Sequence, residues 1–279
     1  MSDFIVTHEP TLRLSFFVGA LIAMAAWESF LPRRMRTISR WIRWPSNVGL
    51  VALNTVVARL LLPGVAVAVA LSGERHSFGL LNAIAFPAWA RAAIAIVLLD
   101  LAIYAQHLIF HAVPVLWRFH RVHHADLDFD VTTGSRFHTG EILISAAYKI
   151  ALVFVLGVPA ATFIVFEILL NATSSFSHGN ARLPPILDRI LRAVVVTPDM
   201  HRVHHSVLRA ETNSNFGFNL SCWDRLFRTY RAEPTKGHAT MTIGLDSFRD
   251  VADLRLDRML VQPFIEAPGR YPIWNDGGA

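Results

Sequence analysis

Four long apolar runs set the fold class of this chain of 279 residues, at about residues 14–31, 48–71, 87–112 and 142–176. A helix needs about 20 apolar residues to cross a hydrocarbon layer of ~30 Å, and every run is near or above that length. Charged residues make up only 17% of the chain, against about 25% in a soluble domain. The alternative is a soluble protein that buries all four runs as core helices. The low charge and the run lengths favour an integral membrane protein.

The placement of arginine orients these runs. Five arginines with no acidic residue among them lie between the first and second runs: Arg33, Arg34, Arg36, Arg40 and Arg43. Positive loops stay in the cytoplasm, so we expect the second run to lead outward and the third to return. The last run is interrupted at residues 157–159 by Gly-Val-Pro, which predicts two helices joined by a tight turn. The sequence thus predicts an all-α membrane protein of the inner (cell) membrane. It has four to five membrane helices and a cytoplasmic helical cap.

Histidines gather where these runs reach the cytoplasmic side. The pentad His-Arg-Val-His-His occurs at 120–124 and again at 201–205, and His107 and His111 end the third run. In a helix, positions i, i+3 and i+4 share one face, so each group presents its imidazoles together. The topology places all three groups at the same membrane face. Eight histidines are therefore the predicted catalytic and metal-binding residues: His107, His111, His120, His123, His124, His201, His204 and His205.

The composition of this set constrains the metal. Neutral imidazole is the commonest metal ligand among side chains, and the single cysteine, Cys222, excludes a cysteine-rich site. Eight imidazoles exceed the needs of one four-coordinate zinc, so two metal ions fit the number better. Imidazole binds iron, zinc, copper and nickel alike, so the ligand type does not choose among them. The alternative is a set of interfacial histidines that bind lipid phosphate.

The remaining histidines divide into two groups. His178 ends the predicted membrane hairpin and His138 begins it, so both are further candidate metal ligands. The alternative for His178 is a helix-terminal histidine that bonds a free carbonyl. His138 could equally support a ligand or be an ordinary interfacial residue. We expect the other three histidines, at positions 8, 76 and 238, to be solvated.

Carboxylates and amides near the pentads are expected to orient the imidazoles through the second ring nitrogen. The candidates are Asp126, Glu141, Glu167, Asp199, Asp224 and Asn215. Two charges also fall deep in predicted membrane helices, Arg59 in the second run and Asp100 in the third. Charges inside a membrane are usually paired or functional. We expect these two to form an ion pair that fixes the helix carrying His107.

With these motifs in place, the chain resembles the fatty acid hydroxylase/sterol desaturase superfamily of membrane di-iron oxygenases over about residues 95–232. The resemblance extends from the histidine boxes to Arg136-Phe137-His138, Ser177-His178-Gly179-Asn180, Thr197-Pro198-Asp199-Met200, Asn213-Ser214-Asn215-Phe216-Gly217 and Trp223-Asp224-Arg225-Leu226-Phe227. Leu108 stands where many members have arginine, so no subfamily is assigned. The resemblance implies two iron ions (Fe2+/Fe3+), O2, and electrons from outside. Purified protein can carry zinc in place of iron.

The expected activity is O2-dependent hydroxylation, or desaturation, of a lipid such as an acyl chain, sterol or carotenoid that enters from the membrane. The chain contains no haem segment or nucleotide-binding glycine motif, so a separate redox partner supplies the electrons, and we expect no nucleic acid partner. The alternatives are a non-redox metal- or lipid-binding membrane protein and a single-metal lipid hydrolase. The expected domains are N-terminal membrane helices (1–90), a catalytic domain (91–233) and a loosely packed cytoplasmic tail (234–279). The sequence leaves the oligomeric state open.

Overall fold

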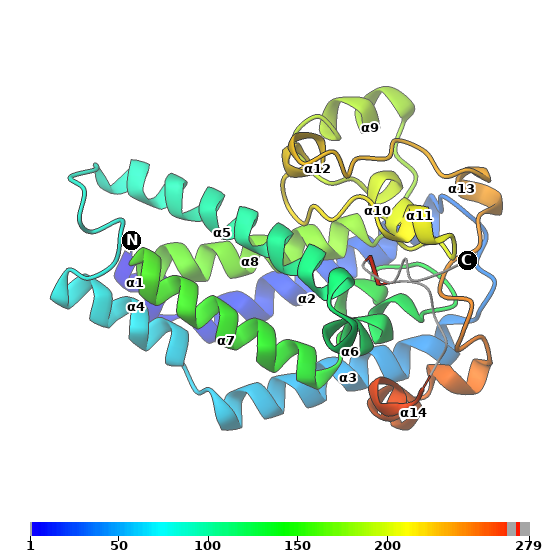
Figure 1. Ribbon diagram of the computed structural model, residues 1–279, viewed down its shortest axis with the longest axis horizontal. Helices are drawn as coiled ribbons and strands as arrows, with labels where there is room; N and C mark the ends of the chain where they lie inside the picture. The colour runs from blue at the N-terminus through cyan, green and yellow to red at the C-terminus, as the bar shows by residue number, and fades with distance from the viewer. Residues whose placement is uncertain (1, 267–271, 274–279) are drawn as a thin grey trace.

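The computed structural model describes residues 2–266 and 272–273, and most of these residues are helical. Figure 1 shows a bundle of long helices with a cap of short helices and loops at one end. Within the described ranges, β structure is limited to isolated bridges. The prediction of an all-α fold is confirmed.

The bundle follows the apolar runs closely. Its helices are α2 (Glu9–Phe30), α3 (Arg40–Leu61), α4 (Val65–His76), α5 (Ala88–Ala112), α7 (Thr139–Leu156) and α8 (Ala160–Ser177), and the short α1 (Ser2–Thr7) precedes them. In the described residues, α2, α5, α7 and α8 are each long and apolar enough to cross a membrane, and α3 with α4 can form a fifth span. The expected four to five membrane helices are therefore confirmed.

The second run is bent rather than continuous. Helices α3 and α4 meet at an angle of 46°, and the break falls at Pro63 and Gly64. Proline disfavours a helical conformation at the residue before it. Gly64 has a φ of 65°, a conformation that favours glycine. The last run forms the expected hairpin, because Gly157 ends α7 with a φ of 68° and Pro159 caps the start of α8.

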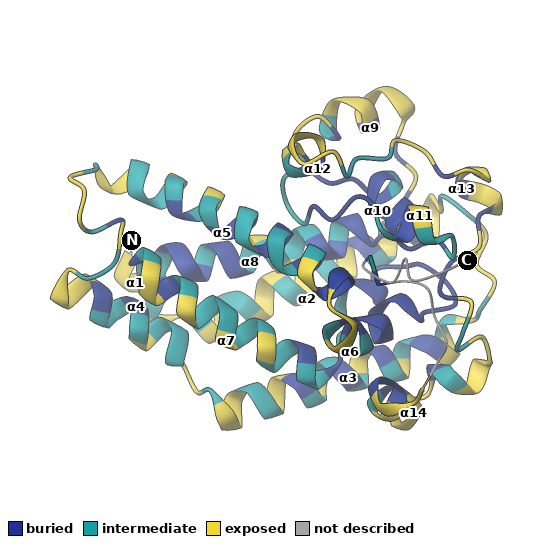
Figure 2. Ribbon diagram, viewed as in Figure 1, coloured by how far each residue is buried: buried dark blue, intermediate teal, exposed yellow. Residues whose placement is uncertain are grey.

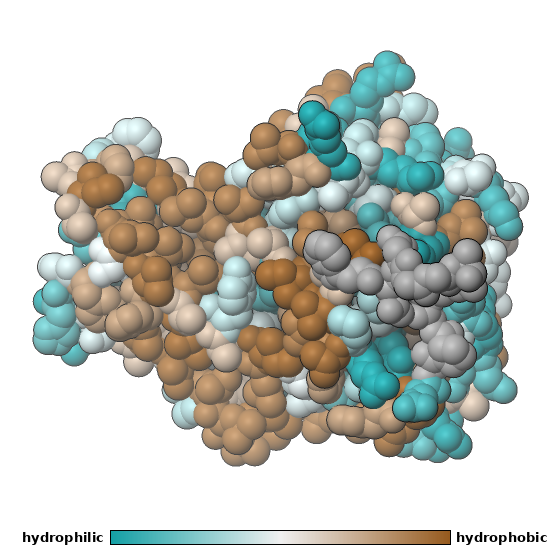
Figure 3. Space-filling model, in the orientation of Figure 1, coloured by the Kyte–Doolittle hydropathy of each residue, from teal (hydrophilic) through white to brown (hydrophobic). Residues whose placement is uncertain are grey.

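The surface divides the molecule in the same way. The most apolar 18-residue windows of α2 and α7 are only 6% and 11% buried, so these helices present apolar side chains outward. In Figure 3 hydrophobic residues dominate the surface of the bundle, and hydrophilic residues are concentrated over the cap. Figure 2 shows the complementary pattern, with fully buried segments gathered in the cap. An apolar exterior of this extent belongs in lipid, so the bundle is the membrane part of the protein.

The cap consists of short elements from two parts of the chain, between α5 and α7 and after α8. They are α6 (Pro114–His124), η1 (Thr133–Ser135), α9 (Pro185–Leu191), α10 (Pro198–His204), α11 (Arg209–Thr212), α12 (Cys222–Leu226), α13 (Gly237–Thr240), η2 (Val251–Leu254), α14 (Leu256–Val261) and η3 (Gln262–Phe264). Helices α2 and α8 both end at the cap and α3 begins there (Figure 1). The junction of bundle and cap is therefore where the histidine-bearing segments meet.

Residues 235–266, which form most of the described part of the expected loose tail, are packed against the cap. Met241, Leu254 and Met259 are at most 2% exposed. Met259 joins Leu50 of α3 and Val122 of α6 in one apolar cluster. The reason is that apolar side chains of this segment cover the outer side of α6, which would otherwise face water. Residues 267–271 and 274–279 of the predicted tail lie outside the described residues.

The predicted Arg59–Asp100 ion pair is wrong. Arg59 is exposed on α3. Asp100 instead accepts hydrogen bonds from the indole Nε1 of Trp223 at 2.8 Å and the backbone N–H of Leu220 at 3.1 Å. A cap loop folds back against α5 here, and its buried N–H groups need an acceptor. Asp100 therefore fastens the cap to α5.

Candidate metal centre

A proline corner brings the first histidines together. Val113 is extended (φ −92°, ψ 116°) and Pro114 begins α6. Proline disfavours a helical conformation at the residue before it. At the start of a helix its missing N–H costs no hydrogen bond, because the N–H groups of the first turn have no partner within the helix. The chain therefore turns between α5 and α6 and folds α6 back toward the end of α5. As a result the Nε2 atoms of His111 and His124 lie 3.1 Å apart.

The second pentad lies on α10, a helix of seven residues, and on its C-cap residue. Thr197 caps α10 through its side chain, which accepts from the N–H of Met200, and Pro198 occupies the first turn. Capping and proline at this end favour helix initiation. Helix α8 ends beside it and delivers His178. The Nε2 atoms of His178 and His201 are separated by 3.0 Å.

Nine histidines form two buried clusters at this junction. In each cluster one ligand atom per residue lies within 4.8 Å of all the others. The first cluster contains His107, His111, His120, His124 and His204, and the second contains His123, His178, His201 and His205. Each pentad therefore contributes to both clusters. The eight box histidines and His178 are brought together as the sequence predicts.

Hydrogen bonds to acceptors fix the tautomer of several of these rings. The Nδ1 atoms of three histidines lie 2.7–2.8 Å from backbone carbonyl oxygens: His107 from Phe216, His178 from Ser174 and His204 from Ser214. A carbonyl only accepts, so Nδ1 carries the proton and donates. The Nε2 atom of each ring then presents its lone pair to the cluster. This is the ligand form of imidazole.

Two further rings of the first cluster have side-chain partners. The Nδ1 of His120 lies 2.7 Å from Oε1 of Glu141, and both groups are buried. The Nδ1 of His111 lies 3.1 Å from Oδ1 of Asn213. A carboxylate or amide oxygen on the outer nitrogen orients a metal-binding ring and raises its basicity.

The ring nitrogens of both clusters fit metal ions. The Nε2 atoms of His107, His120 and His204 are buried without a hydrogen-bond partner, which costs free energy unless a cation satisfies them. In the second cluster, Nε2 of His178 lies 3.2 Å from Nε2 of His123. Two imidazole–metal bonds of ~2.0–2.1 Å at tetrahedral or octahedral angles hold their nitrogens roughly 2.8–3.4 Å apart. The observed separations fall in this range.

Burial keeps the cap histidines neutral. Burial, reinforced by the neighbouring imidazoles, lowers the pKa of five of them well below 6.5: His123, His124, His201, His204 and His205. Burial also lowers the pKa of His178 to about 4, although its bond to the carbonyl of Ser174 opposes the shift. A neutral ring is the form that coordinates a metal. Protons therefore compete poorly for these sites near neutral pH.

His138 lies apart from both clusters. Its Nδ1 accepts from the N–H of Gly140 at 2.9 Å as the cap of α7, and its Nε2 lies 3.2 Å from the carbonyl oxygen of Leu260. Both nitrogens are already used, so the geometry does not support the expected tenth ligand. His238, expected to be solvated, is only 4% exposed and lies beside Asp199 and Glu233. Packing of the chain after residue 234 buries it.

The expected carboxylates divide by what they contact. Glu141 reaches a ring of the clusters directly, as expected. Asp224 acts one step further away, because it accepts from the N–H groups of Phe216 and Gly217 at 2.7 and 2.8 Å. Those bonds fix the loop whose Phe216 carbonyl accepts from His107. Asn215 fastens the same loop to α10 through the carbonyl oxygen of Met200 at 2.8 Å.

Three other carboxylates pair with cations instead of imidazoles. Asp126 accepts twice from Arg43 at 2.7 Å, and Asp130 accepts from the same guanidinium at 2.6 Å. Burial raises the pKa of Asp126, but Arg43 outweighs it and lowers the pKa to about 2. Asp199 pairs with Arg33 and Arg202, and Glu167 pairs with Lys149 and Arg13. Cations compete for these carboxylates, which sequence spacing alone does not reveal.

The supporting carbonyls were not foreseen from the sequence. The backbone oxygens of Ser174, Ser214 and Phe216 orient rings of both clusters, yet any residue type supplies a carbonyl. The one available signal was the segment Asn213–Gly217, which carries part of the family resemblance. In that segment Asn215 has a φ of 53°, a conformation that asparagine tolerates better than most residues. This turn directs the carbonyls of Ser214 and Phe216 toward two rings of the first cluster, His204 and His107.

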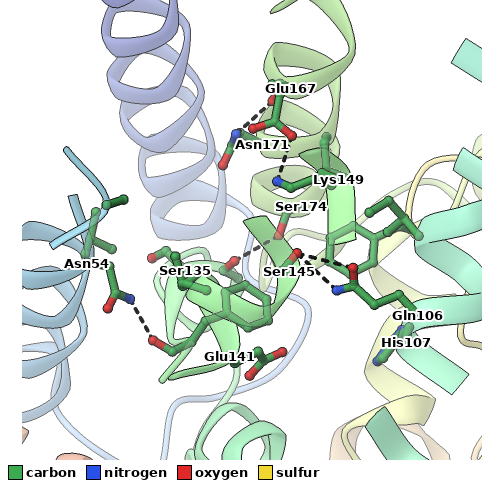
Figure 4. A pocket seen from close by; sticks show the side chains of 18 of the residues that line it. Asn54, Gln106, His107, Ser135, Glu141, Ser145, Lys149, Glu167, Asn171 and Ser174 are labelled. Atoms are coloured by element: carbon green, nitrogen blue, oxygen red, sulfur yellow. Dashed lines mark hydrogen bonds and ion pairs between the residues drawn. The ribbon is translucent and has the colours of Figure 1, made fainter. Parts of the chain in front are cut away.

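A cavity of about 350 Å³ opens beside the first cluster and extends into the bundle. His107 and His120 line one end, and apolar side chains such as Ile103, Phe110 and Phe218 line much of the wall. Figure 4 shows polar side chains from α5, α7 and α8 pointing into the same space. An apolar molecule of lipid type fits a cavity of this kind.

The chain is similar to known lipid-modifying enzymes. Residues 92–229 match the fatty acid hydroxylase family. The ornithine lipid hydroxylase of Rhizobium tropici is 33% identical over 50% of this chain and 41% of its own length. Human alkylglycerol monooxygenase is 27% identical over 54% of this chain and 33% of its own. Rat cholesterol 25-hydroxylase is 28% identical over 50% and 47%. The chain thus matches less than half the length of these relatives, and no solved structure matches it.

Proposed function

Through residues 92–229 this chain belongs to the fatty acid hydroxylase/sterol desaturase superfamily, and we propose that it is a membrane-bound di-iron oxygenase that hydroxylates or desaturates a lipid C–H bond. The observation that carries the proposal is the pair of clusters of five and four buried histidines. Nitrogen-only clusters of this size suit redox-active transition metals with positions left open. We propose residues 91–233 as the catalytic domain.

Two iron ions would be held by the nine clustered histidines, one ion in each cluster. When bound, they supply the redox chemistry by which O2 and two external electrons oxidise a C–H bond. For hydroxylation the balance is one oxygen atom into the lipid and one, with two protons, into water. The protein orients the rings through Glu141, Asn213 and the three backbone carbonyls, and burial favours the neutral form of the cap histidines described above. Zinc would occupy the same ligands without redox activity.

The cavity would hold the substrate against the first cluster. Phe110 and Phe137 line the cavity beside His107 and His120, and their apolar surface excludes water from the reacting carbon. The cavity lies within a bundle whose exterior faces lipid, so the substrate comes from the bilayer. We propose that the clusters lie on the cytoplasmic side of the inner (cell) membrane, since the arginines of residues 33–43 lie at the cap end. A separate redox protein would dock there to supply electrons.

Metal analysis with lipidomics tests this function. The full chain would be expressed with iron, and its metal content and the membrane lipids of the cells would be measured with and without O2. The matched variants are His204→Ala, which removes a ligand of the first cluster, and His76→Ala, which removes an exposed histidine on α4. We expect two irons per chain and an O2-dependent lipid product in wild type and His76→Ala. His204→Ala should lose the product and at least one iron.

The other outcomes identify the alternatives. One zinc per chain with a cleaved lipid would indicate a hydrolase that uses an activated water. Bound metal with no lipid change in any variant would indicate a non-redox binding protein. Equal products from His204→Ala and wild type would refute the assignment of the cluster.

A further inference from the structure

An ionic group lies inside the membrane part of the bundle. The Lys149 ammonium on α7 lies 2.7 Å from Oε1 of Glu167 on α8, and Arg13 of α2 lies 3.0 Å from Oε2 of the same carboxylate. Lys149 is ten residues into α7, roughly 15 Å from its cap end. Charges at such depth are costly and usually mark a functional site. None of these three residues contributes to the histidine clusters.

The ionic group faces the cavity that reaches the clusters. Lys149 and Glu167 both line it, together with His107 (Figure 4). His120 also lines this cavity. Glu141, Ser145 and Lys149 follow one another at four-residue spacing and so share one face of α7. Lys149 therefore lies roughly 12 Å along the helix from Glu141, which holds His120. The cavity has a metal end and, about two helical turns away, a polar end.

A second polar pair lies between the two ends. The amide Nε2 of Gln106 on α5 lies 3.1 Å from Oγ of Ser145 on α7. Gln106 directly precedes His107, and both line the cavity. A hydrocarbon ligand would leave the remaining donors and acceptors of these groups unpaired, at a cost in free energy, whereas a ligand with a polar group could bond them.

The charge balance indicates what the polar end binds. Lys149 and Arg13 carry two positive charges, and Glu167 and Glu9, which lies 2.6 Å from Arg13, carry two negative charges. The group is therefore neutral overall and does not call for a charged ligand. The Lys149 ammonium has three N–H donors, of which Glu167 takes one. The remaining donors suit a neutral acceptor oxygen.

We propose that this polar end recognises an uncharged oxygen function of the substrate, such as a hydroxyl, ester or ether. The substrate would then be an oxygenated lipid rather than a pure hydrocarbon, with its attacked carbon at the metal end. This inference rests on the proposed function for the meaning of the cavity. The competing explanation is that the ion pair only joins α7 to α8.

Ligand binding by the full chain in detergent separates these explanations. The probes are dodecan-1-ol, dodecane and dodecanoate, titrated against the rise in unfolding temperature that binding produces. We expect wild type to bind dodecan-1-ol about tenfold more tightly than dodecane, the effect of one buried hydrogen bond to a charged donor. Dodecanoate should bind more weakly than the alcohol. Equal binding of alcohol and alkane, or tighter binding of dodecanoate, would overturn the proposal.

Variants connect the preference to the ion pair. The double variant Lys149→Met with Glu167→Leu removes both charges, and Arg13 keeps Glu9 as its partner, so no lone charge is left buried. It should lose the alcohol preference and keep the affinity for dodecane. Lys149→Arg, which retains donors, should preserve the preference. If the double variant does not fold, Lys149→Met decides: it leaves Glu167 paired with Arg13 and should weaken only the alcohol, severalfold.

Metal content measured on the same samples keeps the two proposals apart. An alcohol preference in protein that binds no iron and oxidises no lipid would refute the proposed function and leave this inference standing. Iron-dependent lipid oxidation with no discrimination between alcohol and alkane would refute this inference and leave the proposed function standing.

Discussion

The hydrogen bond from His120 to Glu141 offers a direct test of the first cluster. The two atoms are 2.7 Å apart, and the residues are 2% and 5% exposed. The hydrogen bond is therefore shielded from bulk water. Glu141→Ala removes the acceptor, and Glu141→Gln keeps an acceptor oxygen but removes its charge. Both variants leave every predicted ligand in place.

The expected magnitude follows from this geometry. Groups that orient a ligand histidine typically contribute 10–100-fold to metal affinity, or about 1.4–2.7 kcal/mol. The Glu141 bond is short, charged and buried, so Glu141→Ala should raise the dissociation constant of the first-cluster metal by about 100-fold. Glu141→Gln should raise it by about tenfold. The second cluster should be unaffected, because Glu141 contacts none of its histidines.

A chelator titration measures both sites. Purified protein loaded with iron is equilibrated with increasing chelator, and the iron that remains bound is quantified. Wild type should release its two irons at similar chelator concentrations, whereas Glu141→Ala should release one much earlier. Glu233→Gln is the matched control, since the Glu233 side chain is 66% exposed. If Glu141→Ala retained both irons as wild type does, or lost both together, the pairing of Glu141 with one cluster would be refuted.

Three further predictions follow from the cap. Arg43→Met leaves Asp126 and its neighbour Asp130 buried without their cation, which should cost about 3–5 kcal/mol; a wild-type unfolding temperature would contradict this. In metal-free protein the folded-state pKa of His178 is about 4, below its unfolded value of 6.5, so the unfolded state binds more protons below pH 6.5. His178 should therefore contribute about 2 kcal/mol to the loss of stability between pH 7.5 and 5, in addition to the contributions of the five other histidines whose pKa burial lowers; His178→Gln should reduce the decline in unfolding temperature by that share. The single exposed cysteine, Cys222 on α12, should react with a membrane-impermeant thiol reagent only in inside-out vesicles; labelling of intact cells would place the cap outside.

The membrane helices could be predicted because hydrophobic length is a local property. All four apolar runs are helical, although the second divides into α3 and α4 and begins eight residues early, at Arg40. The turn at Gly157 and Pro159 can be predicted from residue type. The bend at Pro63 and Gly64 can likewise be predicted from residue type, because proline and glycine interrupt helices. By contrast, the packing of Met259 against α3 depends on how the chain returns to the cap. No local pattern specifies that return.

The candidate ligands could be predicted from spacing, but their division into clusters could not. Helical periodicity puts His120, His123 and His124 on one face, and yet His123 joins a different cluster from its two neighbours. That division depends on the turn at Pro114 and on how α10 docks against α8. His138 has the same residue type and a suitable position in the sequence. It differs only in that Gly140 and Leu260 already occupy its nitrogens.

The arginines show why charge is the least predictable part of this sequence. The five between residues 33 and 43 predict the topology of the membrane helices. Three of them also form ion pairs: Arg33 with Asp199, Arg40 with Glu28, and Arg43 with Asp126. Arg33 and Arg43 join the α2–α3 segment to the cap that contains the clusters, and Arg40 joins α3 to α2. An arginine at the membrane surface can both orient the helices and form an ion pair, because pairing does not move its charge across the bilayer. Thiol labelling of Cys222 tests the orientation independently of these arginines. The ion pairs predict that losing one of these arginines weakens the cap before it changes the topology.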